Sequence, residues 1–425
     1  MAEHLARGVA TVLRKARILD TAKARILDPL DLLIEGGWIR VVQQRIVAPE
    51  GAEEIDASEG VLMPGLIDCH VHVLASQLHL GQLARLPNVL ASLRAVPILR
   101  GMLARGFTTV RDAGGADFAL AQAVEDGTIE GPRIFPSGRA LSQTGGHGDM
   151  RERSDSVEPC ACTPKVGAIA RVVDGVDAVR KAVREEIQRG ARQIKIMASG
   201  GVASPNDPIH FLGYSEDEIR AAVEEAANAG TYVMAHAYTA RAIARAVRCG
   251  VRSIEHGNLV DAAAARLMAD HGAVAVPTLI TYEALAREGQ ALGLPPESVA
   301  KIDAVRGSGL ASLRIFAEAG VRMAFGSDLL GASHRFQAGE LRLRAEVLGA
   351  AEAIRAATLH AAFLLCEEGR LGVVQEQARA DLLLVKGNPL EDIGLLTGQC
   401  GEGIAWVMKE GRLVAGASCA AKQAT

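Results

Sequence analysis

The sequence predicts an α/β protein in which a (β/α)₈ TIM barrel carries a small β domain built from both ends of the chain. In the middle of the chain, short apolar strands alternate with longer helical patterns, which is typical of βα units around a parallel sheet. Towards both ends, only short strands and turns are predicted. The length of 425 residues suggests two or three domains at about 150 residues each.

The strands near the two ends are separated by Asp, Pro and Gly residues. Near the start, strands are predicted at Ala16–Leu19, Asp31–Ile34 and Trp38–Val42, and the pair Gly36-Gly37 between the last two predicts a hairpin turn. Near the other end, Ala380–Val385 has the same short, apolar character. We therefore expect residues 1–62 and 370–425 to form the small domain, and residues 63–369 to form the catalytic barrel.

Eight strands are predicted for the barrel. Seven of them closely follow a glycine, the residue that lets a helix end in the left-handed conformation before the next strand. Ser215 and Glu218 open one of the intervening helices as a capping box. The predicted strands are Val61–Val73, Phe107–Asp112, Arg133–Ser137, Gln193–Ser199, Tyr232–Tyr238, Arg252–His256, Ala273–Thr278 and Arg322–Asp328.

An open, doubly wound sheet is the competing fold. That fold would normally place a Gly-rich phosphate loop after its first strand. Here the first strand ends instead in His70-Val71-His72. Eight strand-and-helix units in about 300 residues fit the barrel better.

The composition argues against several functional classes. The chain has 46 Lys and Arg against 50 Asp and Glu, a net charge of −4, whereas a nucleic-acid-binding protein would need a basic face. No apolar run approaches the roughly 20 residues of a membrane-spanning helix, and the first residues lack the apolar core of a secretory signal. We therefore expect a cytoplasmic protein with reduced cysteines. Cys160 and Cys162 lack the second pair that a zinc site of that kind needs.

His70 and His72 close the first barrel strand. Side chains alternate along a strand, so the two imidazoles point to the same side and can chelate one metal ion such as zinc. The alternative is two partly exposed histidines at a strand end, because a His-x-His pair alone is a weak motif.

Four further predicted strands each carry one coordinating or ionisable residue near the carboxyl end. These residues are Lys195, His236, His256 and Asp328. In a barrel such strand ends converge on one mouth, where active sites lie. Buried ionisable groups are costly unless they are paired or bound to a metal, so we interpret the set as a metal site.

Lys195 differs from the other members because an ammonium group has no acceptor and cannot bind a cation. Burial between Ile194 and Ile196 would lower its pKa and favour the neutral amine, which could be modified to an anionic ligand. The alternative is a lysine paired with a carboxylate such as Asp328. The residues alone leave both alternatives open.

The segment Met63–His72, with the sequence MPGLIDCHVH, resembles the opening motif of the amidohydrolase superfamily of metal-dependent hydrolases. Residues 380–390 resemble its closing segment, so the resemblance covers essentially the whole chain. It implies a barrel flanked by a β-sandwich from both termini, and two divalent metal ions, most commonly Zn²⁺, bridged by a carboxylated Lys195. The implied metal ligands are His70, His72, Lys195, His236, His256 and Asp328.

Other segments resemble a group within the superfamily that includes Xaa-Pro and Xaa-Arg or Xaa-Lys dipeptidases and enzymes that hydrolyse ochratoxin A. These segments are Thr108–Asp112, Gly145–Asp149, Lys195–Gly201 and His236–Tyr238. The resemblance implies hydrolysis of dipeptides or N-acyl amino acids, with release of the C-terminal amino acid. Ochratoxin A, an amide between phenylalanine and an aromatic acid, is one candidate substrate.

The implied mechanism gives the catalytic roles to three residues. Two metal ions can activate a shared water, and Asp328 is expected to accept its proton and pass it to the leaving amine. His256 takes part as a metal ligand beside it. Tyr238 lies on the same side of its strand as His236 and is expected to donate to an oxyanion or to a substrate carboxylate. A core tyrosine with a satisfied hydroxyl is the alternative.

Two more residues are expected to bind the substrate. The resemblance suggests that His147 contacts the terminal carboxylate or a carbonyl, with a loop histidine of no role as the alternative. Arg111 could bind a carboxylate through its planar fork, although a structural ion pair with Asp112 or Asp328 is the blander interpretation. Exposure to solvent is expected for His210 and His334.

Two further functions compete with the peptidase interpretation. The first is another hydrolase of the superfamily, such as a cyclic-amide hydrolase or a deaminase. Mononuclear deaminases usually lack the lysine at the position of Lys195, which weighs against a deaminase. The second is a non-enzymatic relative, but here every ligand position is filled. The resemblance also implies a homo-oligomer acting on a small-molecule substrate, without nucleic-acid or membrane partners.

Overall fold

The computed structural model describes residues 10–151, 165–202, 204, 207–289, 291 and 296–414, without the side chains of residues 296–300. Cys160 and Cys162 lie outside the described residues. Within them, no helix combines the length and the apolar character needed to cross a membrane. Cys69, Cys249 and Cys366 are free thiols, whereas Cys400 is disulfide-bonded, so the expectation of reduced cysteines is wrong for Cys400.

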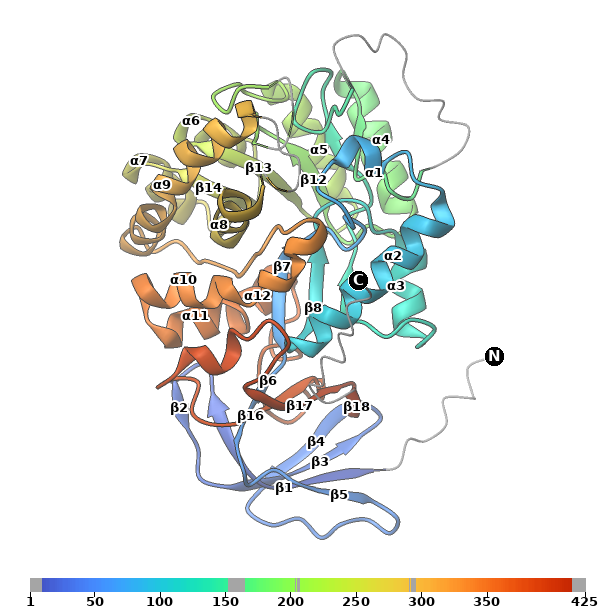
Figure 1. The fold of residues 1–425 in the computed structure, drawn as a ribbon, viewed down its shortest axis with the longest axis vertical. Coiled ribbons are helices and arrows are strands. Elements are labelled where there is room, and N and C mark those ends of the chain that lie inside the picture. The colour runs from blue at the N-terminus through green and yellow to red at the C-terminus, as the bar shows by residue number, and fades with distance from the viewer. Residues whose placement is uncertain are drawn as a thin grey trace.

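Strands from both ends of the chain share one nine-stranded sheet, drawn in blue and red at the lower end of Figure 1. Its order is β18-β17-β16-β6-β1-β3-β4, with β2 and β5 paired to β1. The antiparallel pair β6 and β16 sets Val61 opposite Val385 and Pro64 opposite Leu382, and thereby joins the two ends. One continuous strand order does not by itself give the two packed sheets of a sandwich. The strands are β1 (Thr11–Asp20), β2 (Arg25–Ile26), β3 (Leu30–Glu35), β4 (Trp38–Gln43), β5 (Glu53–Asp56), β6 (Val61–Pro64), β16 (Leu382–Val385), β17 (Ile404–Lys409) and β18 (Arg412–Val414).

The first predicted barrel strand, Val61–Val73, is divided in the structure. Its first part is β6, in the nine-stranded sheet, and its second part is β7 (Leu66–Val71), which pairs with β8. Gly65 stands at the break, where an added Cβ would lie 2.0 Å from Thr108 Oγ1. Only a glycine lets the backbone pass so close to a neighbouring side chain.

The remaining strands form two parallel sheets. One has the order β7-β8-β9, the other has the order β11-β10-β12-β13-β14-β15, and strand pairing does not join the two into a closed ring. β10 and β11, each three residues long, were not predicted. The bounds are β8 (Phe107–Asp112), β9 (Arg133–Phe135), β10 (Ala140–Ser142), β11 (Ala170–Val172), β12 (Ile194–Met197), β13 (Val233–Thr239), β14 (Ser253–Leu259) and β15 (Val274–Val276).

The eighth predicted strand, Arg322–Asp328, is not a strand in the structure. Its backbone nevertheless bonds to both neighbours, because Ala324 N donates to Ala275 O at 2.9 Å and Phe325 O accepts from Cys69 N at 2.8 Å. Asp328 has a φ of 51°, a left-handed conformation that a regular strand does not contain. The segment therefore links β15 to β7 without forming a ladder.

Helices lie around the parallel strands in Figure 1. The predicted capping box is confirmed, because the side chains of Ser215 and Glu218 each accept from the other's backbone N–H. The helices are α1 (Leu80–Leu83), α2 (Asn88–Ala104), α3 (Phe118–Glu125), α4 (Val176–Gln188), α5 (Glu216–Asn228), α6 (Ala240–Arg248), α7 (Ala262–Asp270), α8 (Leu279–Glu288), α9 (Pro296–Glu318), α10 (Gly339–Leu348), α11 (Ala350–Ala356) and α12 (Leu359–Leu364), with 3₁₀ turns η1 (Gly331–Phe336) and η2 (Ile393–Leu396).

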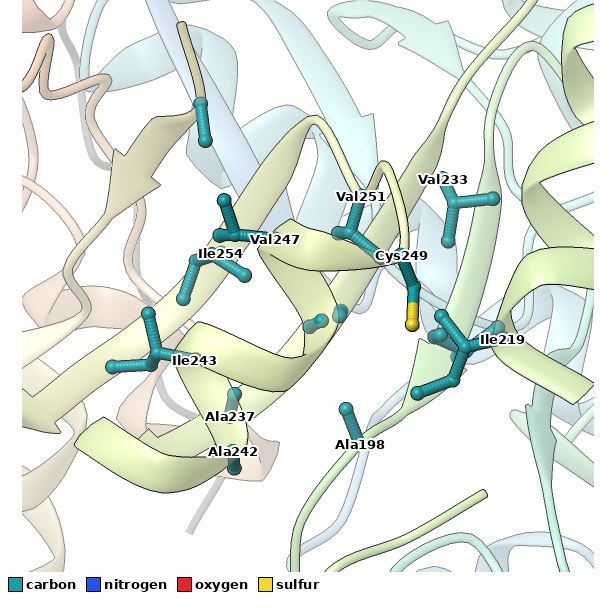
Figure 2. Close-up of a cluster of buried hydrophobic side chains, with 14 of the residues drawn as sticks. Ala198, Ile219, Val233, Ala237, Ala242, Ile243, Val247, Cys249, Val251 and Ile254 are labelled. Carbon is teal, nitrogen blue, oxygen red and sulfur yellow. The ribbon is translucent and has the colours of Figure 1, made fainter. Parts of the chain in front are cut away.

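One apolar cluster packs β13 and β14 against α5 and α6 (Figure 2). Ile219 of α5 and Ile243 and Val247 of α6 are buried there together with Val233 and Ile254 of the two strands. Burial of each such side chain contributes roughly 1.5–3 kcal/mol. The cluster fixes the two strands whose polar ends belong to the candidate site.

Candidate metal centre

The six predicted ligands lie within or just after neighbouring segments of the parallel sheets. The ring centroids of His70 and His72 are 5.5 Å apart, those of His70 and His256 are 5.0 Å apart, and those of His236 and His256 are 4.5 Å apart. The charge of Asp328 acts on the Lys195 ammonium. The set brought together is His70, His72, Lys195, His236, His256 and Asp328.

Asp328 is at the centre of the tightest part of this group. One ligand atom each from His70, His256 and Asp328 lies within 4.8 Å of the others. Asp328 Oδ1 is 3.5 Å from His70 Nε2 and 3.4 Å from His72 Nε2, and Asp328 Oδ2 is 3.9 Å from His256 Nδ1. Imidazole nitrogens around a carboxylate are a donor set that zinc and similar divalent ions prefer, so these residues fit a metal ion.

Protein acceptors determine which ring nitrogen of three histidines stays free. His70 Nδ1 donates to Glu255 Oε2 at 2.6 Å, and His72 Nδ1 donates to Gly114 O at 2.9 Å. His236 Nε2 donates to a backbone oxygen at 3.2 Å, that of Gly200. Carboxylates and carbonyls only accept, so the opposite nitrogen of each ring keeps the lone pair that a metal needs.

Two of the candidate ligands have unusual backbone conformations. The φ angles of His256 and Asp328 are 71° and 51°, in the left-handed region that residues other than glycine rarely adopt. Asp328 N donates to His70 O at 2.8 Å, and this turn brings its carboxylate back towards His70 and His72. Backbone strain that the surrounding structure maintains is typical of functional sites.

The state of Asp328 follows from its neighbours. Burial acts to raise the pKa of this carboxyl, but the charge of His70 and the hydrogen bonds with His70 and His72 hold it well below its ordinary value. Burial also lowers the pKa values of His236 and His256 well below the usual range. An ionised carboxylate therefore lies beside His256, and the imidazoles of His256 and His236 are neutral, as metal ligation requires.

Lys195 is 2% exposed, and its ammonium nitrogen has neither an ion pair nor a hydrogen bond with any described residue. The ion-pair partners of Asp328 are histidines, so the alternative of a Lys195–Asp328 pair is not seen. Burial lowers the pKa of Lys195 to about 8. A buried, unpaired amine with a lowered pKa can lose its proton far more easily than a surface lysine.

Glu255 supports His70 from behind. Besides accepting from His70 Nδ1, both of its carboxylate oxygens lie 3.0 Å from Arg111 Nη2, and both residues are fully buried. Burial acts to raise the pKa of Glu255, but the charge of Arg111 and the hydrogen bond from His70 bring it far below its usual value. Glu255 thus remains ionised and keeps the His70 ring in one orientation.

Arg111 does not join the residues that a substrate could touch. It is 0% exposed, and it donates to Cys69 O at 2.6 Å and to Ser253 Oγ at 3.3 Å as well as to Glu255. The expected substrate-binding role of Arg111 is not supported by this position, because its donors are occupied within the protein. The alternative of a structural ion pair fits better, with Glu255 rather than Asp112 or Asp328 as the partner.

Replacing Glu255 by Gln should weaken metal binding. The amide would lose the charge that orients His70 and raises its basicity, and loss of such an outer partner typically costs about 10–100-fold in metal affinity. Competition with a zinc-binding dye would measure the dissociation constants of the two proteins. An E255Q protein that folds, and binds zinc as tightly as the wild type, would contradict this role.

The rings of two substrate-binding candidates, His147 and Tyr238, stack on two of the candidate ligands. The His147 ring stacks on His236 with centroids 4.2 Å apart, and the Tyr238 ring stacks on His256 with centroids 5.2 Å apart. Tyr282 donates to Tyr238 Oη at 2.8 Å, which leaves the hydroxyl hydrogen of Tyr238 for another acceptor. Burial raises the pKa of Tyr238, so the phenol stays protonated.

The loop histidines differ from one another. His210 is exposed, as expected. His334 is only 6% exposed, its Nε2 donates to Ala75 O at 3.1 Å, and burial lowers its pKa to about 3. The expectation of exposure is wrong for His334, because η1 packs it against the segment that follows β7.

A hollow of about 600 Å³ lies away from this centre. Phe118, Phe135, Arg133 and Lys409 are among its lining residues, and none of the candidate ligands lines it. Its lining contains both basic residues, such as Arg133 and Lys409, and carboxylates such as Glu410, so it favours neither an anionic nor a cationic ligand.

The family model of the amidohydrolase family matches residues 61–414. The chain belongs to the amidohydrolase family. Ochratoxinase from Aspergillus niger is 36% identical over 371 residues, which cover 84% of this chain and 76% of that protein. This amidohydrolase is therefore a hydrolase, and its match to ochratoxinase covers most of both proteins.

Solved structures extend the comparison. A prolidase complexed with N-methylphosphonate-L-proline is 60% identical, with a TM-score of 0.94 and coverage of 96% of this chain and 100% of that one. A Xaa-Pro dipeptidase with methionine bound in its active site is 30% identical, with a TM-score of 0.85 and coverage of 96% and 100%. The chain is a dipeptidase-like amidohydrolase.

Several residues behind the ligands of this amidohydrolase were not predicted. Glu255 orients His70, Thr278 Oγ1 lies 2.8 Å from His256 Nδ1, and Asp68 accepts from His70 N at 3.0 Å. Glu255 and Asp68 carried a usable signal, since both are acidic residues within apolar strands that end in ligands. Thr278 carried none, because a hydroxyl at a strand end is common.

Proposed function

We propose that this amidohydrolase is a metal-dependent peptidase or amidase that cleaves dipeptides or N-acyl amino acids and releases the C-terminal amino acid. The observation that supports this proposal most directly is that the Asp328 carboxylate lies among His70, His72 and His256, with Tyr238 beside them. The names of the similar proteins, prolidase, Xaa-Pro dipeptidase and ochratoxinase, support this substrate class. Ochratoxin A is a specific candidate, which would yield phenylalanine and ochratoxin alpha.

In this proposal the six clustered residues would hold two divalent metal ions, and the imidazole-rich donor set favours Zn²⁺. Lys195, buried and without an ion pair, would be the carboxylated bridging ligand. The bound metals would polarise the scissile carbonyl and lower the pKa of water. The remaining ligands are His70, His72, His236, His256 and Asp328.

The protein's own groups then move the protons. Asp328 is ionised and would accept the proton of the attacking water, after which it would pass that proton to the leaving amine. His256 lies beside Asp328, with His256 Nδ1 3.9 Å from Asp328 Oδ2, and would take part as a metal ligand. Tyr238, protonated and with a free hydroxyl hydrogen, would donate to the developing oxyanion or to the substrate carboxylate. His147 would contact that carboxylate.

We further propose that the two parallel sheets and residues 322–328 form a (β/α)₈ barrel, residues 63–369, and that residues 1–62 and 370–425 form a small β-sandwich. Backbone hydrogen bonds from residues 324 and 325 to both β15 and β7 support this closure. By resemblance we propose a cytoplasmic homo-oligomer with a small-molecule substrate.

A hydrolysis screen of the zinc-loaded protein tests the proposed function. The panel should contain N-acyl amino acids ending in Pro, Arg, Lys or Phe, ochratoxin A, and cyclic amides as the competing class, with release of free amine as the readout. We expect turnover of at least one N-acyl amino acid, loss of turnover after dialysis against a chelator, and recovery with Zn²⁺. Turnover of cyclic amides alone would replace the proposal by the ring-opening alternative.

A further inference from the structure

The loop that follows β12, residues 198–213, touches three residues of the candidate site; residues 203, 205 and 206 of this loop lie outside the described part. His147 Nδ1 is 2.7 Å from Ser204 Oγ and 3.5 Å from Asp207 Oδ2. The same loop accepts from His236 through Gly200 O and from Tyr238 N through a serine hydroxyl. The described residues of this loop therefore line the candidate site next to His147, His236 and Tyr238.

The loop is folded tightly around the His147 ring. A Cβ added to Gly201 would lie 2.0 Å from a ring carbon of His147, so only glycine fits there. Asp207 Oδ2 accepts from Gly201 N at 2.8 Å, and Asp207 is 2% exposed. Its other oxygen, Oδ1, is buried without a hydrogen-bond partner. An unsatisfied buried acceptor destabilises a fold, which argues that this carboxylate serves the site rather than stability.

Lys301, in the second turn of α9, holds the loop in this shape. Its ammonium nitrogen lies 3.1 Å from Gly201 O, 3.1 Å from Ser204 O and 3.0 Å from Asp207 O. A lysine has three donors and no acceptor, so three backbone carbonyls satisfy it completely. The next residue, Ile302, is fully buried in a cluster that includes Tyr238, which fixes this end of α9 at the site.

We propose that Lys301 is a positioning residue for substrate recognition. By gathering the three carbonyls, its ammonium keeps Ser204 and Asp207 against the ring of His147. Nε2 of that ring has no protein hydrogen-bond partner among the described residues, and it remains free for the terminal carboxylate of the substrate. This inference rests on the proposed function, in which His147 contacts the carboxylate.

The kinetic test uses the full-length, zinc-loaded Lys301→Met protein, because methionine has a similar length and no donors. For the best N-acyl amino acid of the screen, KM should rise about tenfold while kcat stays within about threefold, since Asp328 and the metal ligands are untouched. The preference for the acid over its C-terminal amide should also fall about tenfold. Lys181→Met, at a side chain that is 79% exposed, is the matched control and should change neither value.

A second variant covers the case in which Lys301→Met does not fold. Asp207→Asn keeps the shape of the side chain and leaves the three backbone carbonyls bound to Lys301. It should lower the preference for the acid over the amide with a similarly small change in kcat. An unchanged preference in folded Asp207→Asn would overturn the link from the loop to the substrate carboxylate.

Hydrogen–deuterium exchange tests, without any substrate, whether Lys301 holds the loop through the three backbone carbonyls. Peptides that span residues 198–213 should exchange faster in Lys301→Met than in the wild type or in Lys181→Met. Unchanged exchange would overturn the inference, as would faster exchange with an unaltered acid-to-amide preference. If the wild type hydrolyses no N-acyl amino acid, the proposed function fails and the substrate half of the inference fails with it. Exchange then still decides whether Lys301 positions the loop.

Discussion

Replacing Asp328 by Asn should lower kcat by at least about a thousandfold with an N-acyl amino acid substrate. Asparagine keeps the size of the side chain but cannot accept the proton of water or pass it to an amine. It also removes the negative charge that lies 3.4–3.5 Å from His70 Nε2 and His72 Nε2. Steady-state kinetics of the zinc-loaded variant would measure the loss.

The control for this change is Asp217→Asn, which alters a side chain that is 83% exposed and should leave kcat unchanged. Circular dichroism and the melting temperature should show that Asp328→Asn still folds, because asparagine has the same size as aspartate and also tolerates the left-handed conformation at this position. Near-normal kcat in a folded, metal-loaded Asp328→Asn protein would exclude this aspartate as the general base.

Replacing Lys195 by Ala should remove both metal and activity. If Lys195 is the carboxylated bridge, its loss takes away an anionic ligand shared by two ions, and zinc content should fall from two per chain to one or none. We expect kcat/KM to fall by at least about a thousandfold, because both metals contribute to the same step. Metal content by mass spectrometry and kinetics on the same preparation would measure both effects.

Chemical rescue separates a bridging role from a merely structural one. A short carboxylate such as acetate or propionate can enter the space left by the lysine side chain and supply two oxygen ligands, so part of the activity should return as its concentration rises. Lys195→Arg should stay inactive, because a guanidinium keeps its proton and cannot be carboxylated. Two zinc ions bound to Lys195→Ala without any added carboxylate would contradict the bridge.

Most of the ligand set could be predicted from the sequence because four histidines and Asp328 follow apolar runs, whereas Lys195 was predicted as a ligand only through the resemblance to the family. His70 and His72 are two residues apart at the end of β7, and His236 and His256 lie in the neighbouring strands β13 and β14, so the proximity within each pair follows from strand geometry. The group that the structure brings together is the one that the pattern indicated.

What the sequence could not provide is the set of contacts between distant side chains. Arg111 was expected either to bind the substrate or to form an ion pair with Asp112 or Asp328; it pairs with Glu255, and that choice depends on which buried carboxylate lies within reach. The segment 322–328 looked like a strand, but the left-handed conformation of Asp328 is imposed by its hydrogen bond to His70 O. Lys301 carries no signal, because its partners are backbone carbonyls that any sequence would have.

The pairing of β6 with β16 has a consequence for how the protein is made. β6 leads through Gly65 directly into β7 and His70, yet its partner strand lies roughly three hundred residues further along the chain. A nascent chain on the ribosome therefore carries an open strand edge next to the segment that contains His70 and His72 until residues 382–385 have emerged. Such an edge is a template for aggregation. Pairing with β16, which is synthesised late, therefore covers the edge of β6 and protects the chain from aggregating through it.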